Sequence, residues 1–119
     1  MTHIAVDDCV FCQIVAHDVP ADVVRETAWT LAFADIAPQA PVHVVVITKD
    51  HHATLEELAG TDPGLLGTLM AEVTVVADDQ GLGVDGYRVV INTGTEGGQT
   101  VGHVHAHVLG GRAMTWPPG

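Results

Sequence analysis

The stretch His103-Val104-His105-Ala106-His107-Val108 decides the fold we expect, because histidine alternates in it with small aliphatic residues. A period of two is typical of a half-buried β-strand, in which successive side chains point to opposite faces of a sheet. We therefore expect three imidazoles on one face and three aliphatic side chains on the other. Neighbouring imidazoles would lie about 6.6 Å apart along such a strand, so that two rings can contact one ligand.

A glycine-rich loop, residues 93–102, precedes this stretch. The loop lacks the lysine and the spacing of a phosphate-binding P-loop. Its glycines can still turn backbone N–H groups toward an anion, with the hydroxyl of Thr100 and the amide of Asn92 nearby. The alternative is an ordinary connection between two antiparallel strands, because glycine is common in turns.

The rest of the chain reads as short strands and helices that are segregated from one another. Such segregation, without βαβ alternation, predicts an α+β fold with an antiparallel sheet. Asp62 is expected to cap the longest helix, with Pro63 at its first position and Gly81 after its end. The other expected elements are a short helix over 11–17, strands over 23–26, 29–34, 43–48 and 86–92, and one or two helical turns over 55–58.

The length and composition of the chain limit its organisation. A chain of 119 residues that is 47% hydrophobic is long enough for one domain with a core and short for two, so we expect a single domain over 1–119. Apolar runs of the length of a membrane span do not occur, and residues 1–8 do not resemble a signal peptide. We therefore expect a cytoplasmic protein with no membrane partner.

Fifteen acidic residues against four basic ones give a formal net charge of −11. This charge repels nucleic acids and anionic membranes, so we expect neither as a partner. A single nucleotide is still compatible with it, because backbone N–H groups and imidazoles can hold one phosphate locally. Solubility, or an ionic environment that favours acidic surfaces, accounts for most of this acidity.

The two cysteines form the motif Cys9-Val10-Phe11-Cys12. A structural disulfide is not expected in a chain without an export signal. Three interpretations remain: a redox pair, which normally follows a strand of a βαβ unit; two of the ligands of a zinc site; and two reduced, half-buried thiols. A zinc site would need further ligands, and His51, His52 and His103 are available.

Five segments together resemble the histidine triad superfamily of nucleotide hydrolases and transferases, and within it the branch of histidine triad nucleotide-binding proteins. The resemblance implies an antiparallel five-stranded sheet with two helices, and a homodimer across whose two-fold axis the sheet continues. The segments are the alternating histidine stretch, residues 35–43 (DIAPQAPVH), Gly97-Gly98-Gln99, Leu109-Gly110-Gly111-Arg112 and Trp116-Pro117-Pro118-Gly119.

The resemblance also implies a catalytic role for four histidines. His105 matches the nucleophile that attacks the α-phosphorus of a nucleoside monophosphate bearing a leaving group. A neutral imidazole suits this role because it attacks without prior deprotonation. His103, His107 and His43 match the histidines that orient the nucleophile or contact the phosphate.

The nucleotide-binding residues follow from the same resemblance. Asp35 matches the carboxylate that accepts hydrogen bonds from the ribose hydroxyls. Thr100, where the branch often has serine, matches a phosphate or leaving-group contact, as do Asn92 and Gln99. The apolar base pocket is matched by Val10, Phe11, Ile14, Phe33 and Ile36, for each of which burial in the core is the alternative.

Zinc-containing members of the superfamily imply a structural zinc site at Cys9, Cys12, His51 and His103, with His52 as an alternative to His51. The implied activity is hydrolysis of purine nucleoside phosphoramidates, such as those of AMP, to the nucleoside monophosphate and an amine. Three alternatives stay open: a dinucleoside polyphosphate hydrolase, a zinc hydrolase whose metal is held by the three alternating histidines, and a non-catalytic nucleotide-binding or scaffold protein.

Overall fold

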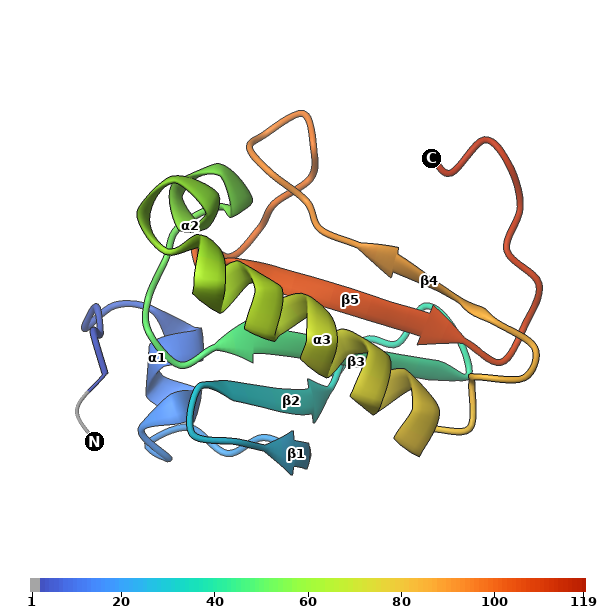
Figure 1. Cartoon of the computed structure of the whole chain (residues 1–119), viewed down its shortest axis with the longest axis horizontal. Coiled ribbons are helices and arrows are strands. Elements are labelled where there is room, and N and C mark those ends of the chain that lie inside the picture. The colour runs from blue at the N-terminus through green and yellow to red at the C-terminus, as the bar shows by residue number, and fades with distance from the viewer. Residues whose placement is uncertain (1–2) are drawn as a thin grey trace.

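A five-stranded antiparallel sheet forms the centre of the computed structural model, which describes residues 3–119 (Figure 1). The strands follow the order β1-β2-β3-β5-β4, so the loop over 93–102 returns β5 between β3 and β4. The α+β fold with an antiparallel five-stranded sheet is thus confirmed. The strands are β1 Val23–Glu26, β2 Thr30–Ala34, β3 Val42–Thr48, β4 Tyr87–Val90 and β5 His105–Gly110.

Strand β5 begins two residues later than the alternating pattern predicts. The backbone N–H of His103 donates to the carbonyl of Val101 (2.9 Å), and that of Val104 donates to the carbonyl of His52 (2.7 Å). These bonds hold residues 103 and 104 in a bend before the ladder with β3 starts at His105. The first histidine of the pattern therefore precedes the strand that carries the other two.

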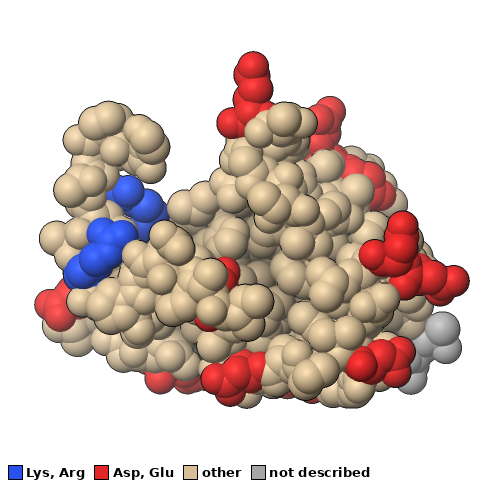
Figure 2. Space-filling view, turned by 180° about the vertical axis from the view of Figure 1, so that it is seen from behind, with Lys and Arg blue, Asp and Glu red and all other residues tan. Residues whose placement is uncertain are grey.

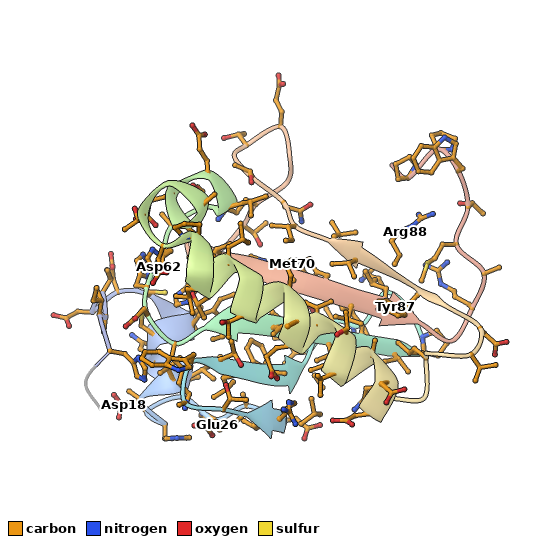
Figure 3. The ribbon with its side chains drawn as sticks, in the orientation of Figure 1. Asp18, Glu26, Asp62, Met70, Tyr87 and Arg88 are labelled. Atoms are coloured by element: carbon orange, nitrogen blue, oxygen red, sulfur yellow. The ribbon has the colours of Figure 1, made fainter. Side chains whose placement is uncertain are left out.

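The helix α3 Pro63–Asp79 forms as its capping residues predict, with the Asp62 carboxylate accepting from the N–H of Leu65 (3.0 Å). Its apolar stripe packs on one face of the sheet, whereas Met70 lies on its outer surface (Figure 3). A helix α1 Val10–Val15 matches the expected short one. The helical turns expected over 55–58 extend to a third helix, α2 Leu55–Thr61, which Thr54 caps.

Alternation along the strands separates two layers of side chains. Val44 and Val46 of β3 pack under α3, together with Ala106 and Val108 of β5. The residues between them point the other way, toward the layer that contains α1. Because His105 pairs with Ile47 and His107 with Val45, both imidazoles lie on the α1 face of the central strand pair.

Within residues 3–119, no helix combines the length and the apolar character that crossing a bilayer would require.

Candidate functional site

The imidazole of His105 is held in one tautomer by a backbone contact. Its Nδ1 lies 2.7 Å from the carbonyl oxygen of His103. A carbonyl only accepts, so Nδ1 carries the proton and Nε2 of the neutral ring keeps a free lone pair. The edge-to-face contact with Phe11, with ring centroids 5.1 Å apart, helps to fix the ring plane. His105 thus presents a nucleophilic nitrogen from a buried, oriented side chain.

His43 and His107 form a directed hydrogen-bond chain. The N–H of Gln39 donates to Nδ1 of His43 (3.0 Å), so the proton of the neutral His43 ring lies on Nε2. That Nε2 lies 2.8 Å from Nδ1 of His107 and donates to it. The remaining nitrogen of His107, Nε2, therefore carries a proton, and His107 lines the pocket beside His105.

A carboxylate lies next to this chain. Oδ2 of Asp35 is 3.3 Å from Nε2 of His43 and 3.9 Å from Nδ1 of His107, whereas Oδ1 accepts from the N–H of Ala37 (2.8 Å). Burial, and after it the neighbouring His105 and His43, lower the pKa of His107 below its ordinary value. The ring is therefore neutral near pH 7 and available as a single-proton donor.

A pocket of about 390 Å³ opens in front of His105 and His107. Its walls are mostly apolar, with Asp35 and Thr100 as the polar exceptions besides the two imidazoles. Every residue expected in a base pocket lines it, with Ile36 fully exposed at the rim: these are Val10, Phe11, Ile14, Phe33 and Ile36.

Several further wall residues were not expected. Val19, Pro20 and Ala21 follow α1 and line the pocket, as do Ala34, Val45 and Val101. Nothing in their pattern separates them from ordinary turn or core residues. The signal that was available is position, since the first three follow a helix already assigned to the pocket.

Two expected nucleotide contacts lie outside the walls of this pocket. The Gln99 side chain holds its own loop together and ties it to the segment before α2: its Nε2 donates to the carbonyls of Ala53 (2.7 Å) and Val101 (3.0 Å), and its Oε1 accepts from the N–H of Gly94 (3.1 Å). Asn92 is half-buried just beyond the end of β4. Of the three residues expected to contact the phosphate or the leaving group, Asn92, Gln99 and Thr100, Thr100 alone lines the pocket.

The ring of His103 belongs to a different cluster. Its Nε2 lies 2.7 Å from the carbonyl oxygen of Thr48 and must donate to it, so the lone pair lies on Nδ1. Nδ1 faces the Sγ atoms of Cys9 (3.4 Å) and Cys12 (3.6 Å). Burial lowers the pKa of this fully buried imidazole to about 4, so the ring is neutral at pH 7.

His51 completes the cluster, with Nδ1 3.3 Å from Sγ of Cys12. The four ligand atoms of Cys9, Cys12, His51 and His103 all lie within 4.8 Å of one another. Zinc bonds of the usual lengths at tetrahedral angles place sulfur and nitrogen ligands about 3.6 Å apart, close to the observed separations. The donor set and its spacing therefore fit a zinc ion.

The choice between the adjacent histidines is decided by the neighbours of His52. Its Nδ1 lies 2.7 Å from Oε2 of Glu57, at the start of α2, and its ring is buried there. His51, whose N–H donates to the carbonyl of Ile4 (2.7 Å), joins the cysteines instead. Both cysteines are free thiols, and burial raises the pKa of the Cys12 thiol.

A single metal held by His103, His105 and His107 does not agree with this arrangement. Both nitrogens of His103 face other partners, the Thr48 carbonyl on one side and the thiols on the other. Nor does the His43–His107 pair have the spacing of two metal ligands: 2.8 Å between nitrogens is a hydrogen-bond distance, whereas two imidazoles on one tetrahedral zinc lie about 3.3 Å apart.

Figure 2 shows the face opposite α3. Acidic side chains are spread around its margin, and the lysine and arginine side chains visible on it gather at one end. The acidic margin of this face therefore repels polyanions, in keeping with the net charge of −11. A bound phosphate would rely on local imidazole and hydroxyl donors, which the pocket supplies.

Comparison with known proteins shows similarity along nearly the whole chain. Residues 16–114 match the HIT domain family. An uncharacterized HIT-like protein of Synechococcus elongatus is 50% identical over 113 residues, which cover 95% of this chain and 98% of that protein. A HIT family hydrolase of Legionella pneumophila has a solved structure that superposes with a TM-score of 0.91 at 46% identity, covering 94% of this chain and 100% of that one.

Two more distant solved structures bear on the ligands. A histidine triad nucleotide-binding protein of Candida albicans is 33% identical, with a TM-score of 0.77, and the match covers 85% of this chain and 73% of that one. A zinc-bound histidine triad family protein of Mycobacterium smegmatis is 36% identical, with a TM-score of 0.78, covering 88% of this chain and 76% of that one.

Proposed function

Because the chain belongs to the HIT domain family, we propose that it is a nucleotide hydrolase that cleaves purine nucleoside phosphoramidates to a nucleoside monophosphate and an amine. One observation carries the proposal. The imidazoles of His105 and His107 line one largely apolar pocket, with their ring centroids 5.0 Å apart. Nε2 of His105 is a nucleophilic nitrogen, and Nε2 of His107 is a proton donor.

Binding of an AMP-like nucleotide follows from the composition of the walls. The apolar side chains of α1 and β2 suit a purine base, and the volume of about 390 Å³ lies in the range of small-molecule sites. The Asp35 carboxylate accepts from the ribose hydroxyls, while Thr100 and the imidazoles face the phosphate. This places the α-phosphorus in front of His105.

The first chemical step transfers the nucleotidyl group to His105. Its Nε2 attacks phosphorus, a nitrogen–phosphorus bond forms, and the bond from phosphorus to the amine breaks with its electron pair going to the amine. The proton on Nε2 of His107 moves to the departing nitrogen and a proton from solvent replaces it on the ring, while the N–H of His43 keeps Nδ1 of His107 unprotonated. The His103 carbonyl stabilises the charge that develops on the His105 ring.

Water then hydrolyses the nucleotidyl-histidine in the second step. The attacking water releases a proton to solvent as the bond from phosphorus to His105 breaks, so both imidazoles begin the next turnover neutral and in the same tautomers. The AMP product leaves with the oxygen of that water. Histidine suits both steps because a phosphorus–imidazole bond is labile enough to break.

We propose a structural zinc at Cys9, Cys12, His51 and His103. The spacing of the four ligand atoms and the zinc-bound relative support it. Zinc would supply a cross-link between the N-terminal segment, the residues after β3 and the bend before β5. The chemical steps above use only imidazoles.

The proposal extends to the assembly and its setting. Strand β4 is one of the two edge strands of the described sheet, and it would pair with its copy in a homodimer so that the sheet continues across the two-fold axis. The chain would act as one HIT domain over residues 1–119. Two free thiols in close proximity agree with a reducing compartment such as the cytoplasm.

The testing experiment is single-turnover mass spectrometry of the protein mixed with adenosine 5′-phosphoramidate, with and without a chelator. We expect an AMP-sized adduct on the wild type that is absent from His105→Gln and survives chelation. Turnover without an adduct, lost on chelation, would indicate a metal hydrolase; binding of AMP without any turnover would indicate a binding protein. Faster cleavage of Ap₃A or Ap₄A would favour the dinucleoside polyphosphate hydrolase.

A further inference from the structure

A second pocket of about 370 Å³ adjoins the nucleotide pocket on the side of the cysteine cluster. The roles described so far leave it without a function. Three residues, Val10, Thr100 and Val101, line both pockets. The other lining residues are Val6, Asp8, Cys9, His51 and Gly102.

The shared residues place this second pocket next to the reacting phosphorus. Thr100 is the wall residue of the nucleotide pocket assigned to the phosphate, and it stands at the boundary between the two cavities. A nucleotide whose base lies against α1 and whose phosphate reaches His105 and Thr100 has its base end enclosed. A substituent on phosphorus can extend past Thr100 and Val101 into the second cavity.

We propose that the second pocket is the leaving-group subsite and that it favours amines carrying a second, positively charged group. This inference rests on the proposed phosphoramidase activity. Asp8 is an exposed carboxylate in the lining, and the described lining includes neither lysine nor arginine. A terminal ammonium would therefore meet an attractive charge there, in a protein whose net charge of −11 already favours cations.

Gly102 leaves the subsite wide. A Cβ built on Gly102 meets no atom within 4 Å, and its φ lies outside the left-handed region. A larger side chain at this position would project into open space without a backbone clash. Residue 102 thus offers a way to narrow the second pocket from a position that does not line the first one.

The test uses three adenosine 5′-phosphoramidates that differ only in the leaving amine: ammonia, a linear monoamine, and a diamine of the same length with a free terminal ammonium. For the wild type we expect kcat/KM for the diamine to exceed that for the monoamine about fivefold, the effect of one exposed ion pair at its upper end. Asp8→Asn should bring this ratio to about one, and rising salt should do the same in the wild type.

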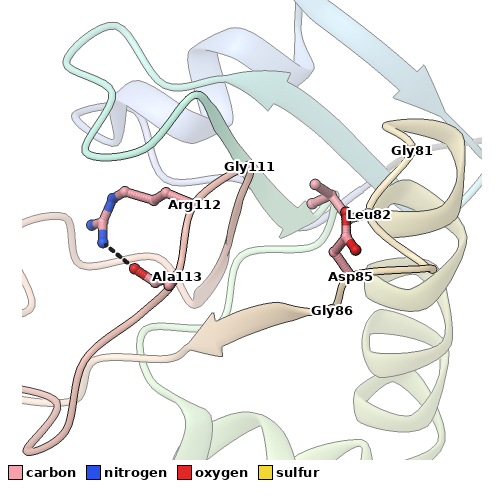
Figure 4. A pocket seen from close by; sticks show the side chains of 7 residues that line it. All are labelled: Gly81, Leu82, Asp85, Gly86, Gly111, Arg112 and Ala113. Atoms are coloured by element: carbon pink, nitrogen blue, oxygen red, sulfur yellow. Dashed lines mark hydrogen bonds between the residues drawn. The ribbon is translucent and has the colours of Figure 1, made fainter.

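A second variant tests the volume of the subsite. In Gly102→Phe, kcat/KM for the two phosphoramidates with long amines should fall by about tenfold relative to kcat/KM for the ammonia compound. Because the comparison is made within one variant, any loss that all three substrates share cancels. Matched controls keep the wild-type ratios. Asp85→Asn removes the same charge from a pocket at the far end of β5 (Figure 4), and Gly67→Phe adds the same ring on the exposed surface of α3, where a Cβ also meets nothing.

The outcomes separate this inference from the activity on which it rests. If the wild type cleaves the ammonia compound but shows a ratio of kcat/KM for the diamine to that for the monoamine near one, the subsite is overturned and the phosphoramidase stays intact. Ratios of kcat/KM that neither Asp8→Asn nor Gly102→Phe changes would have the same meaning. If the wild type cleaves none of the three compounds, the phosphoramidase activity itself is refuted. A shift in the ratio caused equally by Asp85→Asn would show a long-range charge effect and also overturn the subsite.

Discussion

The carbonyl oxygen of His103 lies 2.7 Å from Nδ1 of His105, while the ring of the same His103 faces the thiols of Cys9 and Cys12. One residue therefore joins the cysteine cluster to the nucleophile. A shift of its ring by loss of the cluster would move the backbone oxygen that fixes the tautomer of His105. The cluster and the pocket are two chemical sites with a common structural support.

Replacing the nucleophile should abolish turnover and leave binding. His105→Gln removes the attacking nitrogen but keeps a side chain of similar size, so kcat/KM for adenosine 5′-phosphoramidate should fall by about a thousandfold or more. AMP affinity measured by calorimetry should stay within about threefold, because the apolar walls and Asp35 remain. Wild-type rates in this variant would contradict covalent catalysis at residue 105.

The histidine chain should matter only when the leaving group needs a proton. His43→Phe removes the donor to Nδ1 of His107, and kcat for a phosphoramidate should fall about a hundredfold. Hydrolysis of the p-nitrophenyl ester of AMP, whose phenolate leaves unprotonated, should fall less than about fivefold. An equal loss for both substrates would show that His43 acts by holding the site together instead.

The cysteine cluster should hold zinc through His51 and not through His52. Cys12→Ser should lower the zinc content of the purified protein, and should lower the unfolding free energy by about 3 kcal/mol and Tm by about 10 °C. His52→Asn is the matched control, because the ring of His52 contacts Glu57 and lies outside the cluster, so its zinc content should equal that of the wild type. Zinc loss in the control alone would reverse the assignment.

The stability of the metal-free protein should depend on pH through His103. Burial lowers the pKa of this residue in the folded state to about 4 from an ordinary 6.5, so between these values the unfolded chain binds a proton that the folded chain does not. Stability is therefore fully present above pH 6.5 and is lost as the pH falls toward 4, by roughly 3 kcal/mol in total. Burial of His107 acts in the same direction.

Urea unfolding at intervals from pH 7.5 to 5 measures this loss. In His103→Gln, the free energy of unfolding should fall less over the same range, because one of the buried imidazoles is gone. Identical slopes for the two proteins would assign the pH dependence to other groups.

The spacing of apolar residues, together with the capping and turn residues, was sufficient to predict most of the architecture. The alternation at 103–108 and the β-branched run at 43–48 became the central antiparallel pair, and Asp62 and Pro63 started α3. These features depend on local rules, namely the two-residue period of a strand and the need to cap a helix. The backbone bonds that delay β5 to His105 involve Val101 and His52, and no local pattern indicates them.

The orientation of the site side chains depends on contacts that are distant in the sequence. His51 and His52 are adjacent and chemically identical, and only the positions of Ile4 and Glu57 decide which ring reaches the cysteines. Likewise, the ring of His103 turns to the thiols because the Thr48 carbonyl holds its other nitrogen. The resemblance to a family supplied the zinc ligand set, but the tautomers required the folded chain.

The structure assigns Gln99 a role in joining its loop to Ala53, and this role can be tested against the phosphate contact that the sequence predicts. Gln99→Glu replaces the amide group that donates to the carbonyls of Ala53 and Val101 by an oxygen that both repel. The nucleotide-free protein should lose about 1 to 2 kcal/mol of unfolding free energy, the cost of unpaired hydrogen-bonding groups. Asn92→Asp makes the same chemical change outside that network and should leave the stability within about 0.5 kcal/mol. Unchanged stability of Gln99→Glu combined with a large loss of AMP affinity would show that residue 99 contacts the phosphate instead.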